Sequence, residues 1–268
     1  MDHLSITLDV VRERLSGLKP DTAIVLGSGL GPIADAVQAP VEIPFSDLAA
    51  FPQTSITGHG GSLVFGRLGV QNVMILKGRA HYYEHGRADI MALPLRVMKE
   101  LGCRTIILTN SAGSLNEDVR PGNLMLISDH INMSGTSPLI GMPGDAQFVD
   151  LSHAYDPDLQ HQLRSIAADL NLALASGVYV WMSGPQFETP AEIKMLQLVG
   201  GGAVGMSTVP EVILARQMGL RVAAISSITN MGAGMQESAL SHEQTLSAAA
   251  EGATKLTRLL IKFFADVK

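Results

Sequence analysis

The sequence has little charge and almost no cysteine. Lys, Arg, Asp and Glu together make up 16% of its 268 residues, against an apolar share of 46%. The single cysteine, Cys103, excludes an intrachain disulfide framework and fits a reducing compartment. Because so few charges are available to solvate the surface, we expect part of it to be buried in a subunit contact.

An excess of positive charge and a long apolar segment are also missing. The chain has 19 Lys and Arg against 25 Asp and Glu, a net charge of −6, which disfavours nucleic acid or an anionic membrane as a partner. No uninterrupted apolar run reaches 18 residues, and Met1-Asp2-His3-Leu4 does not begin a signal peptide. We therefore expect a soluble, cytoplasmic protein.

Apolar, β-branched segments alternate with segments of helical periodicity, which predicts an α/β fold. Several of the expected strands are apolar throughout, as is typical of parallel strands covered on both faces. We expect a single domain over residues 1–268, with a central, mostly parallel mixed sheet flanked by helices. Strands are predicted at 22–26, 63–68, 73–77, 104–108, 124–128, 177–181 and 222–228, helices at 4–18, 89–101, 158–170, 190–199, 209–218 and 242–265, and a long loop at 133–150.

Polar side chains follow several of the predicted strands. They are Ser28, Asn110 with Ser111, Ser207 and Asn230. In open α/β sheets, ligands bind beyond the carboxyl ends of the strands. The sequence therefore predicts that these residues share one site.

The first of these segments, Gly27-Ser28-Gly29-Leu30-Gly31, has two interpretations. Its backbone amides and the Ser28 hydroxyl can hold a phosphate, or the segment is a tight strand-to-helix turn. It is not the dinucleotide fingerprint, because position 32 is Pro where G-x-G-x-x-G needs a small Gly or Ala. It is not a P-loop either, because no Gly-Lys-Ser/Thr follows.

Residues 78–86 also carry alternative chemistries. His81, Glu84 and His85 match the H-x-x-E-H pattern of a zinc site, but the flanking glycines favour an irregular loop over the helix that such a site needs. In the alternative that we favour, Arg79 and His81 share an anion. Tyr83 would then reach a sugar hydroxyl. The glycine-flanked His59 is either structural or follows a substrate.

The segment 183–189 places an aromatic ring and a carboxylate at a helix entrance. Thr189 is a plausible N-cap with Glu192 three residues later, which is the capping-box pattern. Phe187 and Glu188 suit a flat ring with polar edges, although a capped helix alone explains them equally well. Asn230 can donate and accept at once, so its amide can read a ring nitrogen and a carbonyl oxygen together.

In order and joint presence, these segments resemble the purine nucleoside phosphorylases of the trimeric, low-molecular-mass type. The resemblance runs over nearly the whole chain, from Leu26 to His242. It rests on residues 26–31, 58–61, 77–84, 109–113, 184–189, 204–211, 228–230 and 240–242.

The resemblance implies roles for individual residues. Asn230, Glu188 and His81 are implied as catalytic. The implied phosphate-binding residues are Ser28, His59, Arg79, His81, Asn110, Ser111 and Ser207. The implied nucleoside contacts are Tyr83, Met206 and His242 at the ribose, Phe187, Glu188 and Asn230 at the base, and Phe148 lent by a neighbouring subunit of a homotrimer.

The resemblance also implies the reaction: reversible phosphorolysis of 6-oxopurine nucleosides such as inosine and guanosine, in purine salvage. The resemblance implies that no metal and no organic cofactor is needed. Inorganic phosphate is a co-substrate. Related methylthioadenosine phosphorylases usually carry Asp where this chain has Asn230, so Asn favours 6-oxopurines. Ser111, where many relatives have Ala, is a small departure, and use of xanthosine stays open.

Overall fold

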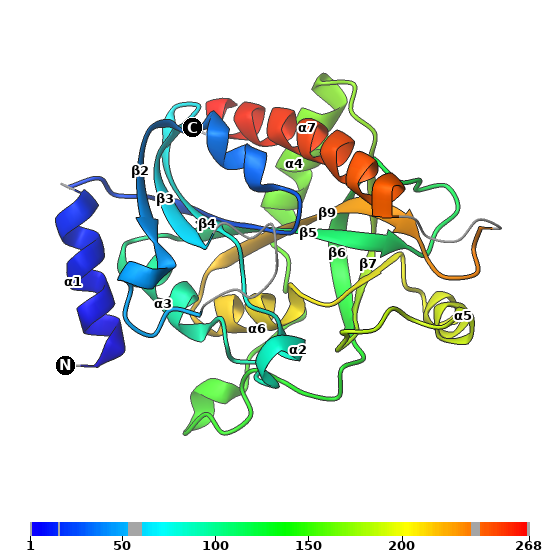
Figure 1. Cartoon of the computed structure of the whole chain (residues 1–268), viewed down its shortest axis with the longest axis horizontal. Coiled ribbons are helices and arrows are strands. Elements are labelled where there is room, and N and C mark those ends of the chain that lie inside the picture. Colours follow the sequence, from blue (N-terminus) through cyan, green and yellow to red (C-terminus); the bar gives the residue numbers. More distant parts are fainter. Residues whose placement is uncertain (1, 16, 53–60, 237–241, 267–268) are drawn as a thin grey trace.

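The structure is a computed structural model that describes residues 2–15, 17–52, 61–236 and 242–266, without the side chains at 242–246 and 266 (Figure 1). Within these residues the strands are β1 (Thr22–Leu26), β2 (Gln38–Pro44), β3 (Ser62–Leu68), β4 (Gln71–Lys77), β5 (Thr105–Ser114), β6 (Leu124–Asn132), β7 (Leu174–Trp181), β8 (Ala203–Gly205) and β9 (Arg221–Met231). The α-helices are α1 (His3–Leu15), α2 (Tyr82–His85), α3 (Ala92–Glu100), α4 (Pro157–Asp169), α5 (Pro190–Leu198), α6 (Val209–Gln217) and α7 (His242–Asp266). Short 3-10 helices lie at η1 (Gly31–Ala36), η2 (Phe45–Asp47) and η3 (Asp145–Gln147).

The strands form one mixed sheet that partly closes on itself. Their order is β2-β3-β4-β1-β5-β8-β7-β6-β9, and β5 also pairs with β9. The strands β5, β8, β7, β6 and β9 therefore make a closed ring, from which β1, β4, β3 and β2 extend as an open sheet. Five of the nine pairings are parallel, which confirms the mostly parallel mixed sheet. The sheet is not open throughout, however, as the rule for ligand sites in open sheets assumes, because β9 pairs with β5.

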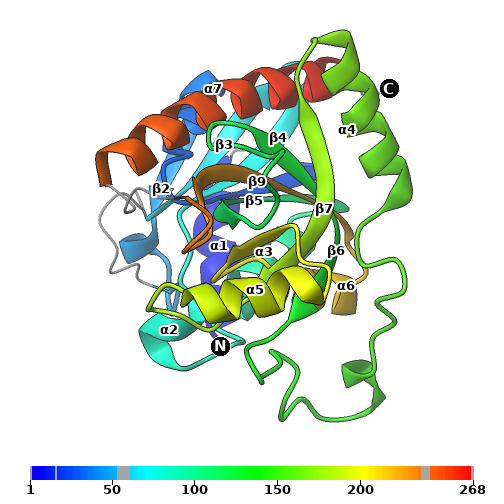
Figure 2. The ribbon, with the colours of Figure 1, turned by 90° about the vertical axis from the view of Figure 1, so that its right-hand side faces the viewer.

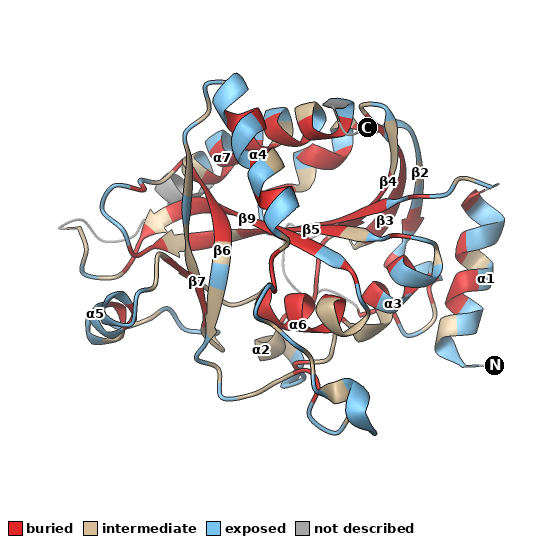
Figure 3. Ribbon diagram, turned by 180° about the vertical axis from the view of Figure 1, so that it is seen from behind, coloured by how far each residue is buried: buried red, intermediate tan, exposed pale blue. Residues whose placement is uncertain are grey.

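Helices cover both faces of the sheet (Figures 1 and 3). Alternate residues of β1 show the two sides: Ala23 and Val25 join the core under α1, α3 and α6, whereas Ile24 and Leu26 join the core under α4 and α7. A third, smaller core lies under α5, where Ile193 and Leu196 pack on Val180 and Val204 of the ring. Figure 2 shows α5 beside the ring of strands. Burial on both faces explains why β1 is apolar at every position.

Most predicted elements are present, with differences at the ends of strands. β5 and β9 run on to Ser114 and Met231, well beyond the predicted ends at 108 and 228. They continue through polar residues because each pairs with the other, and ladder hydrogen bonds use the backbone, whatever the side chain. Asn110, Ser111 and Asn230 therefore lie within strands, and their predicted place beyond the strand ends was wrong.

The edge strand β2 was not predicted. It contains Pro40 and Pro44, and its pairing with β3 shifts register between Gln38 and Val41. Proline is tolerated at a sheet edge or a bulge, where no neighbour needs its missing amide hydrogen. The loop at 133–150 was predicted correctly and contains only η3. None of the described helices combines the length and apolarity needed to cross a membrane.

Candidate active site

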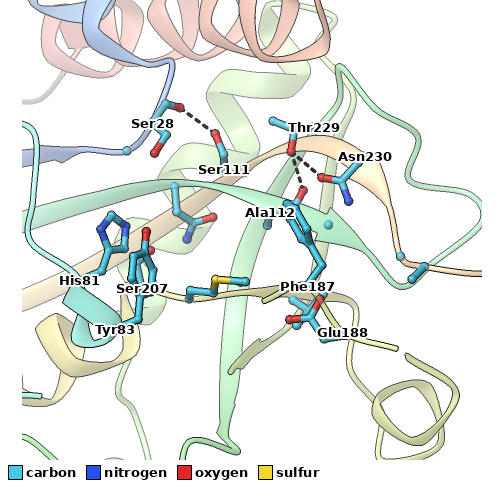
Figure 4. A pocket seen from close by; sticks show the side chains of 18 of the residues that line it. Ser28, His81, Tyr83, Ser111, Ala112, Phe187, Glu188, Ser207, Thr229 and Asn230 are labelled. Atoms are coloured by element: carbon cyan, nitrogen blue, oxygen red, sulfur yellow. Dashed lines mark hydrogen bonds between the residues drawn. The ribbon is translucent and has the colours of Figure 1, made fainter. Parts of the chain in front are cut away.

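A cavity of about 500 Å³ opens between the end of β1 and the ring of strands. Its lining comes from β5, β8 and β9, from the turns after β1 and β9, from α2 and the segment before it, and from the segments before α5 and α6, which are far apart in the sequence. Serine, histidine and tyrosine side chains lie toward one end, and Phe187, Glu188 and Asn230 lie toward the other (Figure 4). The lining residues are Gly27, Ser28, Arg79, His81, Tyr83, Asn110, Ser111, Ala112, Gly113, Phe187, Glu188, Val204, Gly205, Met206, Ser207, Thr229, Asn230, Gly232 and Ala233.

The glycine-rich turn after β1 places Ser28 at the polar end of the cavity. A Cβ atom on Gly27 would lie 2.6 Å from the Cα of Asn110, so only glycine lets β1 approach β5 this closely. The Ser111 hydroxyl donates to the carbonyl oxygen of Ser28 over 2.7 Å, which ties the turn to β5. The segment is therefore the tight turn of the second interpretation, with Gly27 and Ser28 in the cavity lining, and its binding of phosphate stays a prediction.

Arg79 lies at the bottom of this end, with its charge already paired. Its side chain is 1% exposed, and Nη1 is 2.9 Å from Oε1 of Glu211, whose side chain is 3% exposed. The carbonyl oxygens of Val25 and Thr109 accept from Nη2, and Nε has no partner. Arg79 Nε is therefore a buried donor without a partner, and Glu211 neutralises the guanidinium.

His81 is the N-cap residue of the one-turn helix α2, where the sequence favoured an irregular loop. Oε1 of Glu84 accepts from the backbone amide of His81 over 2.7 Å and lies 3.0 Å from His81 Nδ1. The ring of Tyr83 stacks on the His81 ring at 4.9 Å and 15°. Burial, followed by the charge of Glu84, raises the pKa of the Tyr83 hydroxyl, so it stays protonated and can donate.

The zinc alternative finds no support in this geometry. His85 is exposed at the end of α2 and does not line the cavity, while Glu84 is bonded to His81. Among the residues that the structure describes, no three His, Cys, Asp or Glu side chains gather in a way that suits a metal ion.

Asn110 of β5 and Ser207 of the β8–α6 connection meet at Thr208. Asn110 Nδ2 donates to Thr208 Oγ1 over 2.9 Å, and Ser207 Oγ lies 3.1 Å from the same oxygen. Arg79 Nη1 also donates to it, over 3.2 Å. Three predicted site residues are therefore joined through a threonine that the sequence did not single out.

At the other end, Phe187 and Glu188 precede α5. The predicted capping box is present: Thr189 Oγ1 accepts from the Glu192 amide over 3.2 Å, and Glu192 Oε2 accepts from the Thr189 amide over 2.7 Å. The capped helix and the cavity wall are thus the same feature. Burial of Glu188, with repulsion from Glu192 as a smaller cause, raises the pKa of the Glu188 carboxyl.

The amide of Asn230 is held from both sides in β9. Thr229 Oγ1 donates to Asn230 Oδ1 over 2.9 Å, and Asn230 Nδ2 donates to the carbonyl oxygen of Met231 over 3.0 Å. Figure 4 shows Asn230 with Thr229 at the end of the cavity that Phe187 and Glu188 line. One carboxylate and one oriented amide therefore face the same space.

The cavity contains most of the residues predicted for the site. Phe148 does not line it; this side chain follows η3 and is 80% exposed. His59 lies outside the described residues, and so does the side chain of His242, the first residue of α7. Those brought together are Ser28, Arg79, His81, Tyr83, Asn110, Ser111, Phe187, Glu188, Met206, Ser207 and Asn230.

The sequence analysis did not predict two buried residues that contact Arg79. Thr208 and Glu211 were interpreted only as part of a helix start, since Ser-Thr-x-Pro-Glu is a common helix entrance. The signal that could have found Glu211 is a carboxylate among the apolar residues of α6, every one of which is buried. A buried carboxylate requires a buried cation as partner.

The model of the phosphorylase superfamily matches residues 21–265. The chain belongs to the phosphorylase superfamily. It is 47% identical to purine nucleoside phosphorylase 1 of Geobacillus stearothermophilus over 85% of this chain and 84% of that one. It is 44% identical to purine nucleoside phosphorylase 1 of Bacillus subtilis over 90% and 92% of the two chains.

A solved structure of Schistosoma mansoni purine nucleoside phosphorylase in complex with inosine superposes with a TM-score of 0.91, at 35% identity, over 99% of this chain and 96% of that one. Other schistosome purine nucleoside phosphorylase structures hold hypoxanthine, guanosine or adenosine. The resemblance drawn from the sequence is confirmed, and so is the fold.

Proposed function

We propose that this cavity binds a 6-oxopurine nucleoside beside inorganic phosphate and catalyses phosphorolysis to the free base and ribose 1-phosphate. The enzyme class, a pentosyltransferase, follows from the family. The observation that carries the proposal is the division of one cavity into an end with hydroxyls and a buried arginine and an end with Phe187, Glu188 and Asn230.

The polar end suits phosphate. Arg79 Nε is a buried donor without a partner, and Ser28, His81, Ser111 and Ser207 line the same end. An anion at this end can accept from the side chains of Ser28, His81 and Ser207, whereas the Ser111 hydroxyl already donates to the carbonyl oxygen of Ser28 and Arg79 Nε is enclosed by protein. We assign Asn110 to this shell as well, and His59 by resemblance alone.

The opposite end suits a purine with a carbonyl at position 6. Glu188 would accept from the N1–H of such a base, and the Asn230 amide would bond to N7 and O6. A 6-aminopurine lacks the N1–H and offers a donor where Asn230 Nδ2 would also donate. The proposed preference for inosine and guanosine over adenosine rests on this mismatch. Phe187 would provide the aromatic ring against which the base packs.

The ribose would lie between the two ends. Tyr83 stacks on His81 at the phosphate end, and its hydroxyl stays protonated, so it can donate to a sugar oxygen. Met206 lines the cavity beside these residues. By resemblance, His242 is assigned to the 5′-hydroxyl.

The reaction follows from this order of groups. A phosphate oxygen bonds to C1′ while the bond from C1′ to N9 breaks, and the electron pair of that bond goes to the purine. The ribose becomes cationic in the transition state and is stabilised by the adjacent phosphate anion. Asn230 stabilises the negative charge that develops on the base, an effect worth about 3 kcal/mol in comparable sites. His81 would help to hold the attacking phosphate.

We also propose that the active form is a homotrimer in which Phe148 enters the site of a neighbouring subunit. The supporting observation is that an aromatic side chain in the long loop is left 80% exposed within one subunit. Exposed aromatic rings are typical of surfaces that another protein covers. The single domain over 1–268, the cytoplasmic location, the absence of metal and organic cofactor and the role in purine salvage stay predictions.

The test is to mix the protein with inosine, with and without inorganic phosphate, and to follow hypoxanthine release. We expect release that requires phosphate and is matched mole for mole by ribose 1-phosphate. Release without phosphate would indicate a hydrolase, and binding of inosine without release would indicate a binding protein; either result contradicts the proposal.

A further inference from the structure

Thr208 adopts a backbone conformation that threonine rarely takes. Its φ and ψ are 74° and −51°, and the amide of Val209 donates to the carbonyl oxygen of Ser207 over 2.8 Å. This is the rare γ-turn, which is strained for a β-branched residue. Such strain persists only where surrounding contacts hold it, and it often marks functional sites.

The hydroxyl of Thr208 does not serve the helix that it precedes. Thr208 is the N-cap residue of α6, but its side chain makes no capping hydrogen bond. A threonine at this position usually accepts from a backbone amide of the first turn. Here the hydroxyl is fully buried and bonds to three residues of the proposed phosphate shell.

The direction of each hydrogen bond follows from the donors available. Arg79 Nη1 and Asn110 Nδ2 can only donate, so they occupy both lone pairs of Thr208 Oγ1. The hydrogen of Thr208 is then left for Ser207 Oγ, 3.1 Å away. Because Ser207 accepts this hydrogen, its own hydrogen is available to an acceptor in the cavity.

We propose that Thr208 is a positioning residue for phosphate: its hydroxyl holds Arg79 and Asn110 in place and directs the Ser207 hydroxyl to donate to the anion. This inference rests on the proposed function. It explains why the hydroxyl turns away from the helix, where it makes no capping hydrogen bond. Thr208 itself does not line the cavity.

The test compares Thr208→Val, which keeps the β-branched shape without the hydroxyl, with Thr208→Ser, which keeps the hydroxyl. Binding of inorganic phosphate is measured by calorimetry, and KM is measured for phosphate and for inosine. We expect Thr208→Val to weaken phosphate binding about tenfold or more, with the inosine KM unchanged. Thr208→Ser should restore most of the phosphate affinity.

A matched control is Thr7→Val. Thr7 is another buried threonine, whose hydroxyl donates to the carbonyl oxygen of Ala49 under α1, away from the cavity. Thr7→Val should bind phosphate as the wild type does. If Thr208→Val fails to fold, Thr208→Gly also removes the hydroxyl, and glycine tolerates the positive φ; it should fold and bind phosphate weakly.

Three results would overturn the inference. Wild-type affinity for phosphate in Thr208→Val or Thr208→Gly would show that the hydroxyl does not position the shell. Equal loss of phosphate and inosine binding in Thr208→Val, not restored in Thr208→Ser, would indicate a structural role only. If the wild type itself fails to bind phosphate, the proposed function is wrong, and this inference is wrong with it. A wild type that binds phosphate beside a Thr208→Val variant that binds it equally well contradicts this inference alone.

Discussion

A carboxylate that accepts from a base must stay ionised although it is half enclosed. Burial works against this at Glu188, because removal from water disfavours the charged form and raises its pKa above the ordinary value of 4.5. Glu188 is thus a residue at which the pH dependence of substrate binding can be tested.

We predict that kcat/KM for inosine falls as the pH drops through this raised pKa. The sign follows from the ionised form: above the pKa the carboxylate accepts from N1–H, and below it the proton blocks that bond. The measurement is a pH profile of kcat/KM, in which Glu188→Gln should lack the acid limb that begins above pH 4.5.

The matched control for this profile is Glu192→Gln. Glu192 forms the capping box of α5 with Thr189, and hydrogen bonds from Thr189 lower the pKa of the Glu192 carboxyl. This variant should keep the acid limb. An unchanged limb in Glu188→Gln would show that another group titrates, such as phosphate itself.

The second residue-scale prediction concerns Asn230→Asp. Aspartate cannot donate to the acceptors N7 and O6 of inosine but can accept from the 6-amino group of adenosine, so activity on inosine should fall about a hundredfold relative to adenosine. The ratio of kcat/KM for the two nucleosides measures this change. The control is Asn72→Asp in β4, outside the cavity lining, which should not change this ratio. An unaltered ratio in Asn230→Asp would contradict the proposed recognition of the purine by Asn230.

At the scale of elements, one carboxylate joins α4 to β9. Asp156 is the N-cap of α4, where it accepts from the amides of Asp158 and Leu159, each over 3.0 Å. It also accepts from Nε and Nη2 of Arg221, the first residue of β9, over 2.7 and 2.9 Å. Hydrogen bonding from Arg221 lowers the pKa of the Asp156 carboxyl.

We predict that Asp156→Ala lowers the free energy of unfolding by about 0.5–2 kcal/mol, the range found for lost N-caps. Because the folded pKa is depressed, this contribution is present above the unfolded value of about 3.9 and is lost as the pH falls through the lower folded pKa. Urea unfolding at neutral pH and at acid pH measures both effects. Asp158→Ala is the control, since that side chain is 94% exposed and should contribute little.

At the scale of the whole molecule, the proposed trimer would complete each site with Phe148 from a neighbouring subunit. We predict that the protein behaves as a trimer in native mass spectrometry. Phe148→Ala should raise the inosine KM about tenfold, as expected for loss of one aromatic contact, and leave the phosphate KM unchanged.

A mixing experiment separates a shared site from a site within one subunit. Phe148→Ala and Asn230→Asp subunits are each impaired, but in mixed trimers an intact Asn230 pocket can lie beside an intact Phe148. Coexpression should therefore restore part of the activity on inosine. Activity no higher than the average of the two variants would contradict a Phe148 that acts across subunits.

Much of the fold was readable from local patterns, because those patterns involve residues close in sequence. The strand at 22–26 and the capping box of Thr189 and Glu192 lie where they were predicted. Strand ends were less predictable: β5 and β9 extend through polar residues only because each supplies the other with backbone partners. The ring of five strands depends on the same pairing.

The sequence by itself determined which chemical groups the site contains: a glycine turn with Ser28, one arginine, a carboxylate and an amide. Only the tertiary structure decided how they are paired. Arg79 meets Thr208 and Glu211 across 129 and 132 residues of chain, and no local pattern reports such a contact. A buried charge must find a partner, but which partner it finds depends on how the sheet brings distant segments together.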